Sequence, residues 1–311
     1  MLGISTCWWN GKSFRGDEIV REALELGFEG VELEYRINTF VYQQMRPQLK
    51  KAPTVLSLHN IFPKPEDRAF EKESGDPFLL SSTEKDKRAM AVKYSIRTIE
   101  HANDLEARVV VLHLGRVDMQ NPTERFKALH QKGKLDHSGG RAFVNKQRRI
   151  RKMTRQKNLD AVLFSLEKLN REAEKRNVFL GIENRYHFYE IPDLEEVGTI
   201  LREFEGGNVR YWHDVGHAAV QENLGLCLQK ELLEAYSGEM IGVHLHDVRG
   251  LEDHLSPGQG EMNYGQISPF LRSASINILE IHSKLEKEDL LRGLQLMKAH
   301  LATPENLPWS C

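Results

Sequence analysis

Eight short apolar stretches alternate with longer segments of helical period along this chain, and this alternation constrains the fold more than any other feature of the sequence. The stretches are rich in strand-favouring residues and cover 2–6, 30–34, 54–59, 108–115, 178–184, 209–214, 241–247 and 276–282. Continuous apolar strands separated by helices are typical of a parallel sheet that helices cover. Eight repeats of the pattern in 311 residues favour an α/β fold of the closed (β/α)8 barrel type, a TIM barrel, over an open, doubly wound sheet.

The segments between these strands carry the complementary signal for helices. Apolar residues recur at helical spacing over 92–102, 159–173 and 290–301. No glycine-rich turn follows the first strand, so a dinucleotide-binding fold has no support. We expect a single barrel domain over residues 1–311. Two long insertions, 60–82 and 116–157, follow the third and fourth strands and should lie on the catalytic face.

Composition argues against several classes of protein. The formal net charge is −2, so nucleic acid is not an expected partner. The three cysteines, Cys7, Cys227 and Cys311, are too few and too far apart for a disulfide framework, which favours a reducing compartment. The N-terminus lacks the pattern of a signal peptide, and no run of about 18 apolar residues predicts a membrane span. We expect a cytoplasmic protein without membrane association; the oligomeric state stays open.

Polar residues that can bind a metal stand at the carboxyl ends of six of the predicted strands. They are His59, His113, Glu183, Asp214, His244 and Glu280. Burying such a group without a partner costs several kcal/mol, and a barrel brings the carboxyl ends of its strands together around one axis. Imidazole with carboxylate is the ligand set of Zn²⁺, Mn²⁺, Fe²⁺ or Co²⁺. The pattern therefore predicts a divalent-metal centre in an enzyme.

Two local motifs extend this ligand set. The motif HDVGHA, residues 213–218, places His217 three residues after Asp214. The segment HLHDVRGLEDHLSPGQG, residues 244–260, follows the seventh strand and ends in a Gly-x-Gly turn. The possible ligands in that segment are His244, His246, Asp247, Glu252, Asp253 and His254.

These motifs, in this order and with IEN before them and LEIH after them, resemble the xylose isomerase-like TIM barrel superfamily, which contains sugar phosphate isomerases and epimerases and the endonuclease IV group. The resemblance covers nearly the whole chain. In the epimerase branch it implies one metal held by Glu183, Asp214, His244 and Glu280. In the endonuclease IV branch it adds His59, His113, His217 and His254 and implies up to three ions per chain. That branch has an Asp two residues before the last histidine; here Glu252 stands there, with Asp253 beside it, so the choice between them is open.

Residues outside the metal set are candidates for substrate binding. The run 141–157 has eight basic and no acidic residues and belongs to the insertion on the expected catalytic face. It would hold an anionic group, although a solvated helix face is an equally good interpretation. The substrate-binding candidates are Arg148, Arg149, Arg151, Arg185 and His246.

Structural roles are alternatives for several of these residues. His59 and His113 are either metal ligands or substrate-binding histidines. Glu34, at the end of the second strand, either contacts substrate or forms a cap or salt bridge. His213 has the outward parity of its strand and should pack away from the barrel axis. The histidines expected on the solvated surface are His101, His130, His137 and His300.

Three functions are compatible with this centre. The first is hydrolysis of a phosphoester, most simply a phosphodiester in a small anionic substrate that contains a nucleotide or sugar phosphate, because clustered ions activate water and stabilise the leaving oxygen. The alternative is isomerisation or epimerisation of a sugar or sugar phosphate, with Glu183 and Glu280 as acid and base around one metal. The third is a binding barrel without chemistry. Two or three ions favour hydrolysis, and one ion favours isomerisation.

Overall fold

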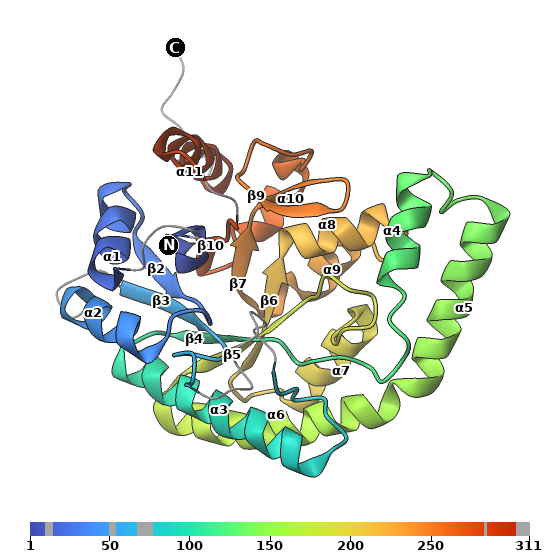
Figure 1. The fold of residues 1–311 in the computed structure, drawn as a ribbon, viewed down its shortest axis with the longest axis horizontal. Helices are drawn as coiled ribbons and strands as arrows, with labels where there is room; N and C mark the ends of the chain where they lie inside the picture. Colours follow the sequence, from blue (N-terminus) through green and yellow to red (C-terminus); the bar gives the residue numbers. More distant parts are fainter. Residues whose placement is uncertain (10–14, 50–53, 67–76, 283–284, 303–311) are drawn as a thin grey trace.

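The computed structural model describes residues 1–9, 15–49, 54–66, 77–282 and 285–302. In this part of the chain, eight parallel strands close into a barrel in the order β1–β10–β7–β6–β5–β4–β3–β2 (Figure 1). The strands are β1 (Leu2–Ser5), β2 (Gly30–Leu33), β3 (Thr54–His59), β4 (Val109–Leu112), β5 (Phe179–Glu183), β6 (Val209–Asp214), β7 (Met240–Leu245) and β10 (Ile276–Leu279). Each overlaps one of the predicted stretches, and the predicted (β/α)8 barrel is confirmed.

Helices surround the barrel and connect its strands (Figure 1). They are α1 (Gly16–Glu25), α2 (Thr39–Leu49), α3 (Lys85–Asp104), α4 (Thr123–Gln131), α5 (Ser138–Thr154), α6 (Gln156–Arg176), α7 (Leu194–Glu203), α8 (Val215–Asn223), α9 (Gln229–Tyr236), α10 (Tyr264–Leu271) and α11 (Lys287–Leu301). Short 3-10 helices form η1 (Thr6–Trp9) and η3 (Ser237–Glu239), and a hairpin of β8 (Asp247–Arg249) and β9 (Glu252–Leu255) follows β7. The hairpin and the loops after the strands provide the side chains of the site.

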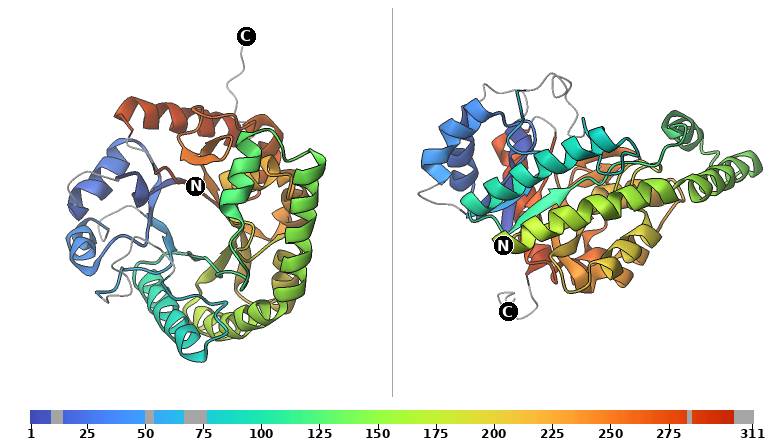
Figure 2. Two further views of the ribbon diagram at one scale, coloured as in Figure 1. Left: turned by 45° about the vertical axis from the view of Figure 1, so that its right-hand side comes forward. Right: turned by 90° about the horizontal axis from the view of Figure 1, so that it is seen from below.

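The insertion predicted at residues 116–157 contains α4 and α5, which extend to one side of the barrel (Figures 1 and 2). Helix α6 then runs back along the barrel and packs against α3. The other predicted insertion, 60–82, falls partly outside the described residues, which omit 67–76.

One rigid aromatic side chain fills the middle of the barrel. Trp212 of β6 is fully buried, and its indole packs against the backbone of Gly181 on β5 and Gly242 on β7. A Cβ atom on Gly242 would lie 2.1 Å from Cζ3 of Trp212, so a larger residue requires displacement. The aliphatic side chains of the same layer are Leu56, Val109, Val111, Ile241, Ile276 and Ile278. This layer is the floor of the site, because the ring of Trp212 lies 5.0 Å from the ring of His244.

Candidate metal centre

The six predicted strand-end residues lie together at the carboxyl end of the barrel. They are His59, Glu183, Asp214 and His244 on β3, β5, β6 and β7, and His113 and Glu280 directly after β4 and β10. Each is buried or nearly so: the most exposed, His113, has 13% of its side chain accessible. The barrel therefore gathers six titratable side chains in a space that excludes most water.

Four of these residues form a central cluster. One ligand atom each from Glu183, Asp214, His244 and Glu280 lies within 4.8 Å of the others. The Nδ1 atom of His244 is 2.7 Å from Glu183 Oε1, 3.0 Å from Glu280 Oε2 and 3.7 Å from Asp214 Oδ2. In a tetrahedral site with metal–ligand bonds of about 2.1 Å, two ligand atoms are roughly 3.4 Å apart. The three distances from His244 Nδ1 are close to this value, two of them shorter and one longer. The central cluster can thus hold one divalent cation.

A carboxylate behind His244 fixes which of its nitrogens faces the central cluster. Glu32 of β2 is fully buried; its oxygens lie 3.1 and 3.2 Å from His244 Nε2, and one accepts from the Ser57 hydroxyl at 2.8 Å. Because a carboxylate oxygen accepts hydrogen bonds, Glu32 holds a proton on Nε2, and Nδ1 faces Glu183 and Glu280; a cation that binds there takes the place of the proton between Nδ1 and these carboxylates. The sequence analysis missed Glu32, whose inward parity in an apolar strand was the available signal, and considered Glu34, for which it left substrate contact and a cap or salt bridge open. Glu34 forms a salt bridge with Arg36 at 2.9 Å, which is the structural role that the sequence analysis considered for it.

A second cluster is continuous with the first through Glu183. Ligand atoms of His59, His113 and Glu183 lie within 4.8 Å of one another, and His113 Nε2 is 3.1 Å from Glu183 Oε2. Nδ1 of His59 donates to the backbone carbonyl of Asn60 at 3.1 Å, so its Nε2 is left to bind a cation. Burial, together with the neighbouring His113, lowers the pKa of His59 and keeps its ring neutral at neutral pH.

A third cluster combines α8 with the β8–β9 hairpin. Ligand atoms of His217, Asp253 and His254 lie within 4.8 Å of one another; His254 Nδ1 is 3.1 Å and His217 Nε2 is 3.8 Å from Asp253 Oδ2. Nδ1 of His217 donates to the carbonyl of Asn184 at 3.1 Å, which again leaves Nε2. Of the two residues between which the sequence left the choice open, Glu252 is exposed, whereas Asp253 lies in this cluster. Successive side chains of a strand point to opposite faces, so β9 presents one of the two to the site.

Asp247 holds this hairpin in position. Its carboxylate oxygens accept from the backbone N–H groups of Val248, Gly258 and Met262 at 2.8–2.9 Å. A Cβ atom on Gly260 would lie 2.4 Å from Asp247 Oδ1, which explains the Gly-x-Gly turn of the motif. Asp247 thus supports the ligands of the third cluster without joining them.

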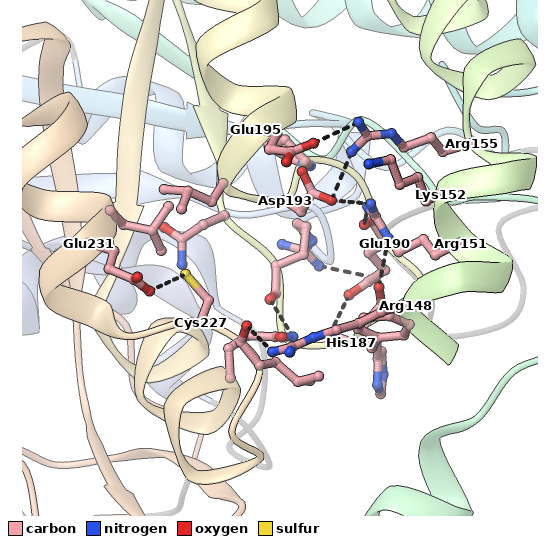
Figure 3. A pocket seen from close by; sticks show the side chains of 18 residues that line it. Arg148, Arg151, Lys152, Arg155, His187, Glu190, Asp193, Glu195, Cys227 and Glu231 are labelled. Atoms are coloured by element: carbon pink, nitrogen blue, oxygen red, sulfur yellow. Dashed lines mark hydrogen bonds and ion pairs between the residues drawn. The ribbon is translucent and has the colours of Figure 1, made fainter. Parts of the chain in front are cut away.

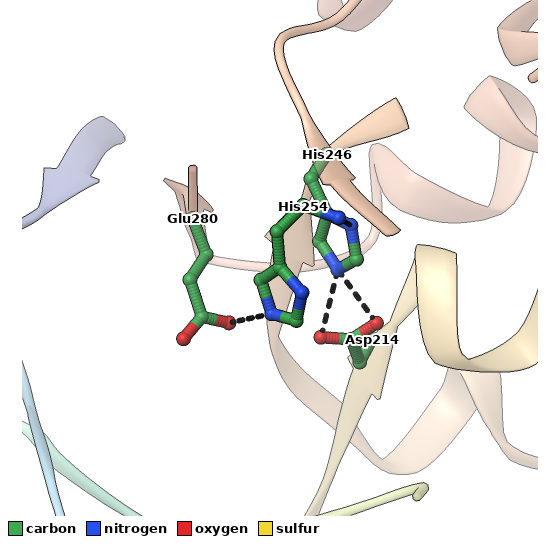
Figure 4. A group of neighbouring side chains, drawn as sticks. All are labelled: Asp214, His246, His254 and Glu280. Atoms are coloured by element: carbon green, nitrogen blue, oxygen red, sulfur yellow. Dashed lines mark hydrogen bonds and ion pairs between the residues drawn. The ribbon is translucent and has the colours of Figure 1, made fainter. Parts of the chain in front are cut away.

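His246 orients Asp214 (Figure 4). The backbone N–H of His254 donates to His246 Nδ1 at 2.8 Å, so Nε2 carries the proton and donates to Asp214 Oδ1 at 2.9 Å. A Cβ atom on Gly216 would lie 2.0 Å from His246 Cε1, which explains the glycine of the DVGH motif. Both nitrogens of this buried ring are engaged, so the structure leaves no donor or acceptor for the substrate that the sequence analysis assigned to His246.

A buried hydrogen-bond chain supports the ends of β5 and β6. Gln229 Nε2 donates to His213 Nε2 at 3.3 Å, His213 Nδ1 donates to the Tyr211 hydroxyl at 2.7 Å, and that hydroxyl donates to Asn184 Oδ1 at 3.0 Å. His213 therefore packs outward, as its parity predicts. Asn184 is held in place by the chain and in turn donates to the backbone carbonyl of Asp214 at 2.9 Å.

Electrostatic pairing keeps the carboxylates of the centre ionised. Burial alone would raise the pKa of Glu183, but Arg185 and His113 outweigh it and hold that pKa well below its usual value. Burial is likewise outweighed at Asp214, where His217 makes the largest contribution to holding the pKa well below its usual value. Ionised carboxylates beside imidazoles whose tautomers are fixed are the donor set that a divalent cation requires. The residues present fit a divalent metal.

The basic run of the insertion contains a buried arginine with a structural role. The guanidinium of Arg151 in α5 donates to the backbone carbonyls of Phe188 and Glu190 and to the carboxylates of Asp193 and Glu196. Figure 3 shows its contact with Asp193. The Nε atom makes one of these bonds and each Nη atom makes two, so all five N–H groups are used. Arg151 therefore has no donor left for the substrate that it was predicted to bind.

The other basic candidates lie in different places. Arg148 and Arg149 are exposed on α5, and Arg148 donates to the carbonyls of Gly225 and Leu226 at 2.9 Å each. Arg148 and Arg151 line a cavity of about 370 Å³ beside α5, and no candidate metal ligand is among its lining residues (Figure 3). Arg185 also reaches this cavity, but its guanidinium pairs with Glu183 at the centre. Of the four arginines, Arg185 is the one in contact with a candidate ligand.

Three of the four histidines predicted on the solvated surface, His101, His130 and His300, are partly buried, and His137 is exposed. The ring of His101 packs edge-on against Tyr42, 5.4 Å between centroids, and against Phe62, at 6.0 Å. The helical period of α3 was recognised, but the loop after β3 that covers this face of α3 has no periodic signal in the sequence.

A closed parallel barrel with buried histidines and carboxylates at the carboxyl ends of its strands defines a class, the (β/α)8 barrels whose strand-end residues fit a divalent metal. The chain matches the family described as Xylose isomerase-like TIM barrel over residues 20–300, and it belongs to that family.

Solved structures with a similar fold include several sugar epimerases. A D-tagatose 3-epimerase-like protein has a TM-score of 0.67 at 18% identity, over 96% of both chains. The 3-keto-D-glucoside 4-epimerase YcjR from E. coli, in its apo form, has a TM-score of 0.66 at 14% identity, over 96% of this chain and 98% of that one. The IolI protein with a bound zinc atom has a TM-score of 0.64 at 13% identity, over 96% and 97%. At these identities the similarity shows the fold.

No curated protein matches the chain in sequence. Within the described ranges, the structure contains no helix long and apolar enough to cross a membrane.

Proposed function

We propose that this protein is a divalent-metal-dependent isomerase or epimerase of a small sugar or sugar derivative, with Glu183 and Glu280 as its acid–base pair. The observation that carries the proposal is the position of the two carboxylates around one nitrogen. Both lie within hydrogen-bonding distance of His244 Nδ1, at 2.7 and 3.0 Å; Glu183 ends β5, two strands from β7, and Glu280 follows β10, the neighbour of β7 on the other side.

The arrangement suits proton transfer at a carbon atom next to a carbonyl group. Such a reaction requires one group that removes the proton and another that returns a proton, and a pair of carboxylates can do both when one is ionised and the other carries a proton. A divalent ion in the central cluster supplies polarisation of the substrate oxygens. Arg185, which contacts Glu183, would bind a substrate oxygen, and His246 and Glu32 hold Asp214 and His244 in position.

The names of the structural neighbours favour this order of hypotheses. Two of them are described as sugar epimerases or epimerase-like, and the IolI structure holds zinc. The sequence analysis had placed phosphodiester hydrolysis first and the isomerase second; the comparisons support the second hypothesis better. The saturated guanidinium of Arg151 also removes part of the argument for an anionic substrate.

Phosphodiester hydrolysis stays the second candidate because of one observation. The second and third clusters are complete ligand sets, and His59 and His217 each have one nitrogen held by a carbonyl and the other left to bind a cation. Several adjacent ions can activate water and stabilise both oxygens of an in-line displacement.

Two measurements test the proposal. The first is the metal content of protein purified without added metal, and the second is incubation with ketoses and keto-sugars in D₂O, followed by NMR. We expect one tightly bound ion and deuterium at the carbon next to the carbonyl group of the product. Glu280→Gln should abolish this incorporation, whereas Glu252→Gln, on the exposed face of β9, should leave it unchanged. Three bound ions, hydrolysis of a phosphodiester and no deuterium incorporation would replace the proposal with the second candidate.

A further inference from the structure

A thiol lies next to the metal centre, on a side that the central cluster does not use. Cys7 is in η1, directly after β1, and is 1% exposed. Ligand atoms of Cys7, Glu280 and His282 lie within 4.8 Å of one another. A sulfur, a carboxylate and an imidazole from two neighbouring strand ends are thus gathered in one place.

The two oxygens of Glu280 face different neighbours. Oε2 lies 3.0 Å from His244 Nδ1 in the central cluster, whereas Oε1 lies 3.7 Å from His282 Nε2. The second distance is too long for a hydrogen bond, but it is close to the roughly 3.4 Å between two ligand atoms on one tetrahedral ion. Glu280 is therefore oriented to bridge two cations.

His282 is held in a position suited to a ligand. Its ring stacks on that of His254, 3.8 Å between centroids at 5°, and His254 stacks on His246 at 4.2 Å and 6°. These ring contacts fix the plane of the imidazole, and its Nε2 faces Glu280 Oε1.

We propose that Cys7, Glu280 and His282 form an accessory site for a thiophilic divalent cation such as Zn²⁺ or Co²⁺, which shares Glu280 with the central cluster. Thiolate sulfur selects such cations over Mg²⁺ or Ca²⁺. In the structure the Cys7 thiol donates to the backbone carbonyl of Ile281 at 3.4 Å. On binding, a sulfur–metal bond forms, the S–H bond breaks, and the proton leaves to solvent.

The surroundings of Cys7 shield its thiol from solvent. The side chain is 1% exposed, and its sulfur is hydrogen-bonded to the backbone carbonyl of Ile281. A buried neutral thiol is slow to react. The position of Cys7 therefore favours cation binding. A cation would replace the thiol proton, and the neighbouring carboxylate of Glu280 would attract its positive charge.

Cobalt spectroscopy tests the accessory site directly. The protein is stripped with a chelator and titrated with Co²⁺ in the Cys227→Ser, Cys311→Ser double variant, which leaves Cys7 as the sole thiol. Visible d–d bands report filling of the central cluster, and a near-ultraviolet thiolate-to-cobalt charge-transfer band reports a bond to sulfur. We expect both in the double variant. Adding Cys7→Ser should abolish the charge-transfer band, retain the d–d bands and lower the cobalt content by one ion per chain.

A second substitution separates coordination from mere proximity. His282→Gln removes the imidazole and keeps the thiol, so it should move the midpoint of the charge-transfer titration to about tenfold higher Co²⁺ or more. The proposal is wrong if the double variant develops d–d bands without a charge-transfer band; the central cluster would then stand unaffected. If circular dichroism shows that the double variant does not fold, the native protein is compared with the Cys7→Ser single variant. Loss of the band in that variant supports the site, and an unchanged band overturns it.

Discussion

Three histidines of the metal centre have one ring nitrogen committed to an acceptor that cannot itself donate. His59 and His217 donate to the backbone carbonyls of Asn60 and Asn184, and His244 donates to the carboxylate of Glu32. The remaining nitrogen of each ring faces its cluster before any cation binds. A site that is organised in this way loses less conformational freedom on binding, and such supporting partners commonly contribute 10–100-fold, as an order of magnitude, to metal affinity.

The first prediction concerns Glu32. Glu32→Gln keeps the shape of the side chain, but the amide can also donate, so the proton of His244 is no longer confined to Nε2. We expect the affinity of the central cluster for Zn²⁺ or Co²⁺ to fall by about 10–100-fold, measured by competition with a chromophoric chelator. Glu34→Gln, two residues along the chain and paired with Arg36, is the matched control and should bind as the native protein does. Equal affinity of the Glu32→Gln variant would show that the carboxylate does not fix the tautomer.

The second prediction concerns His213 and acid. Burial lowers the pKa of His213 to about 4, against about 6.5 in the unfolded chain, so between these values the unfolded state binds a proton that the folded state refuses. The free energy of unfolding should therefore fall as the pH decreases from about 6.5 to about 4, with a contribution from His213 of up to about 3 kcal/mol. The folded state refuses this proton because Gln229 already donates a hydrogen bond to His213 Nε2, so a proton on that nitrogen would have no acceptor.

Urea unfolding across this pH range, with a chelator present, measures the effect. His213→Gln removes the titration, and its unfolding free energy should fall less steeply with acid than that of the native protein, whatever its value at neutral pH. Parallel curves for the two proteins would contradict the assignment.

Individual residues of the site could be predicted from the sequence where their position at the end of a strand is enough to place them in the site. The six strand-end residues follow from the alternation of apolar runs, and they do lie together. Which of Glu252 and Asp253 faces the site depends on the β8–β9 hairpin, whose register is set by Asp247 and its contacts with the Gly-x-Gly turn. The roles of Glu32 and His246 depend on contacts between strands far apart in the sequence, which no local pattern reports.

Among the secondary-structure elements, α5 illustrates how charge patterns mislead. Eight basic residues without an acidic one were interpreted as either an anion site or a solvated helix face, yet Arg151 is buried and connects α5 to the loop after β5 and to the first turn of α7. The acidic partners of Arg151, Asp193 and Glu196, lie in a different segment of the chain. The sequence of the basic run therefore did not show that the charge of Arg151 is neutralised.

The third prediction follows from this contact. Arg151→Met keeps the length and apolar stem but leaves the buried Glu196 carboxylate without its partner, which typically costs about 3–5 kcal/mol. We expect a loss of that order in the free energy of unfolding, measured by urea denaturation. Arg149→Met, in the same basic run but exposed, should change it by less than about 0.5 kcal/mol. If the two substitutions cost the same, the fastening role of Arg151 is wrong.

The fourth prediction concerns the contact between β6 and β7. Gly242→Ala places a methyl group against the rigid indole of Trp212, and overpacking of this kind typically costs about 1–3 kcal/mol. Trp212→Phe in the same chain should recover part of the loss, which gives a favourable coupling energy in a double-mutant cycle. Gly238→Ala, with no atom within 4 Å of the new methyl, is the control and should be close to neutral. Additive effects of Gly242→Ala and Trp212→Phe would contradict the packing.

For the molecule as a whole, the barrel was predictable and the chemistry was less so. The fold follows from a periodic pattern repeated eight times, so errors at one strand do not alter it. The choice between hydrolysis and isomerisation depends instead on how many of three adjacent clusters bind ions, and Glu183 takes part in two of them. Ligand residues alone do not determine that number, because affinity depends on tautomers and supporting contacts that appear only in three dimensions.

The last prediction concerns the metal and global stability. Four carboxylates, Glu32, Glu183, Asp214 and Glu280, are buried around His244, and a cation that binds only the folded chain stabilises it by mass action. At a free Zn²⁺ concentration a hundred times Kd the gain is about 2.7 kcal/mol, which for a chain of this length raises Tm by roughly 5 °C. Differential scanning calorimetry of chelator-treated protein, with and without added Zn²⁺, measures it. Asp214→Asn keeps an oxygen to cap α8 but removes one ligand charge, so its Tm should respond far less to Zn²⁺. An equal rise in the native and variant proteins would place the stabilising ion outside the central cluster.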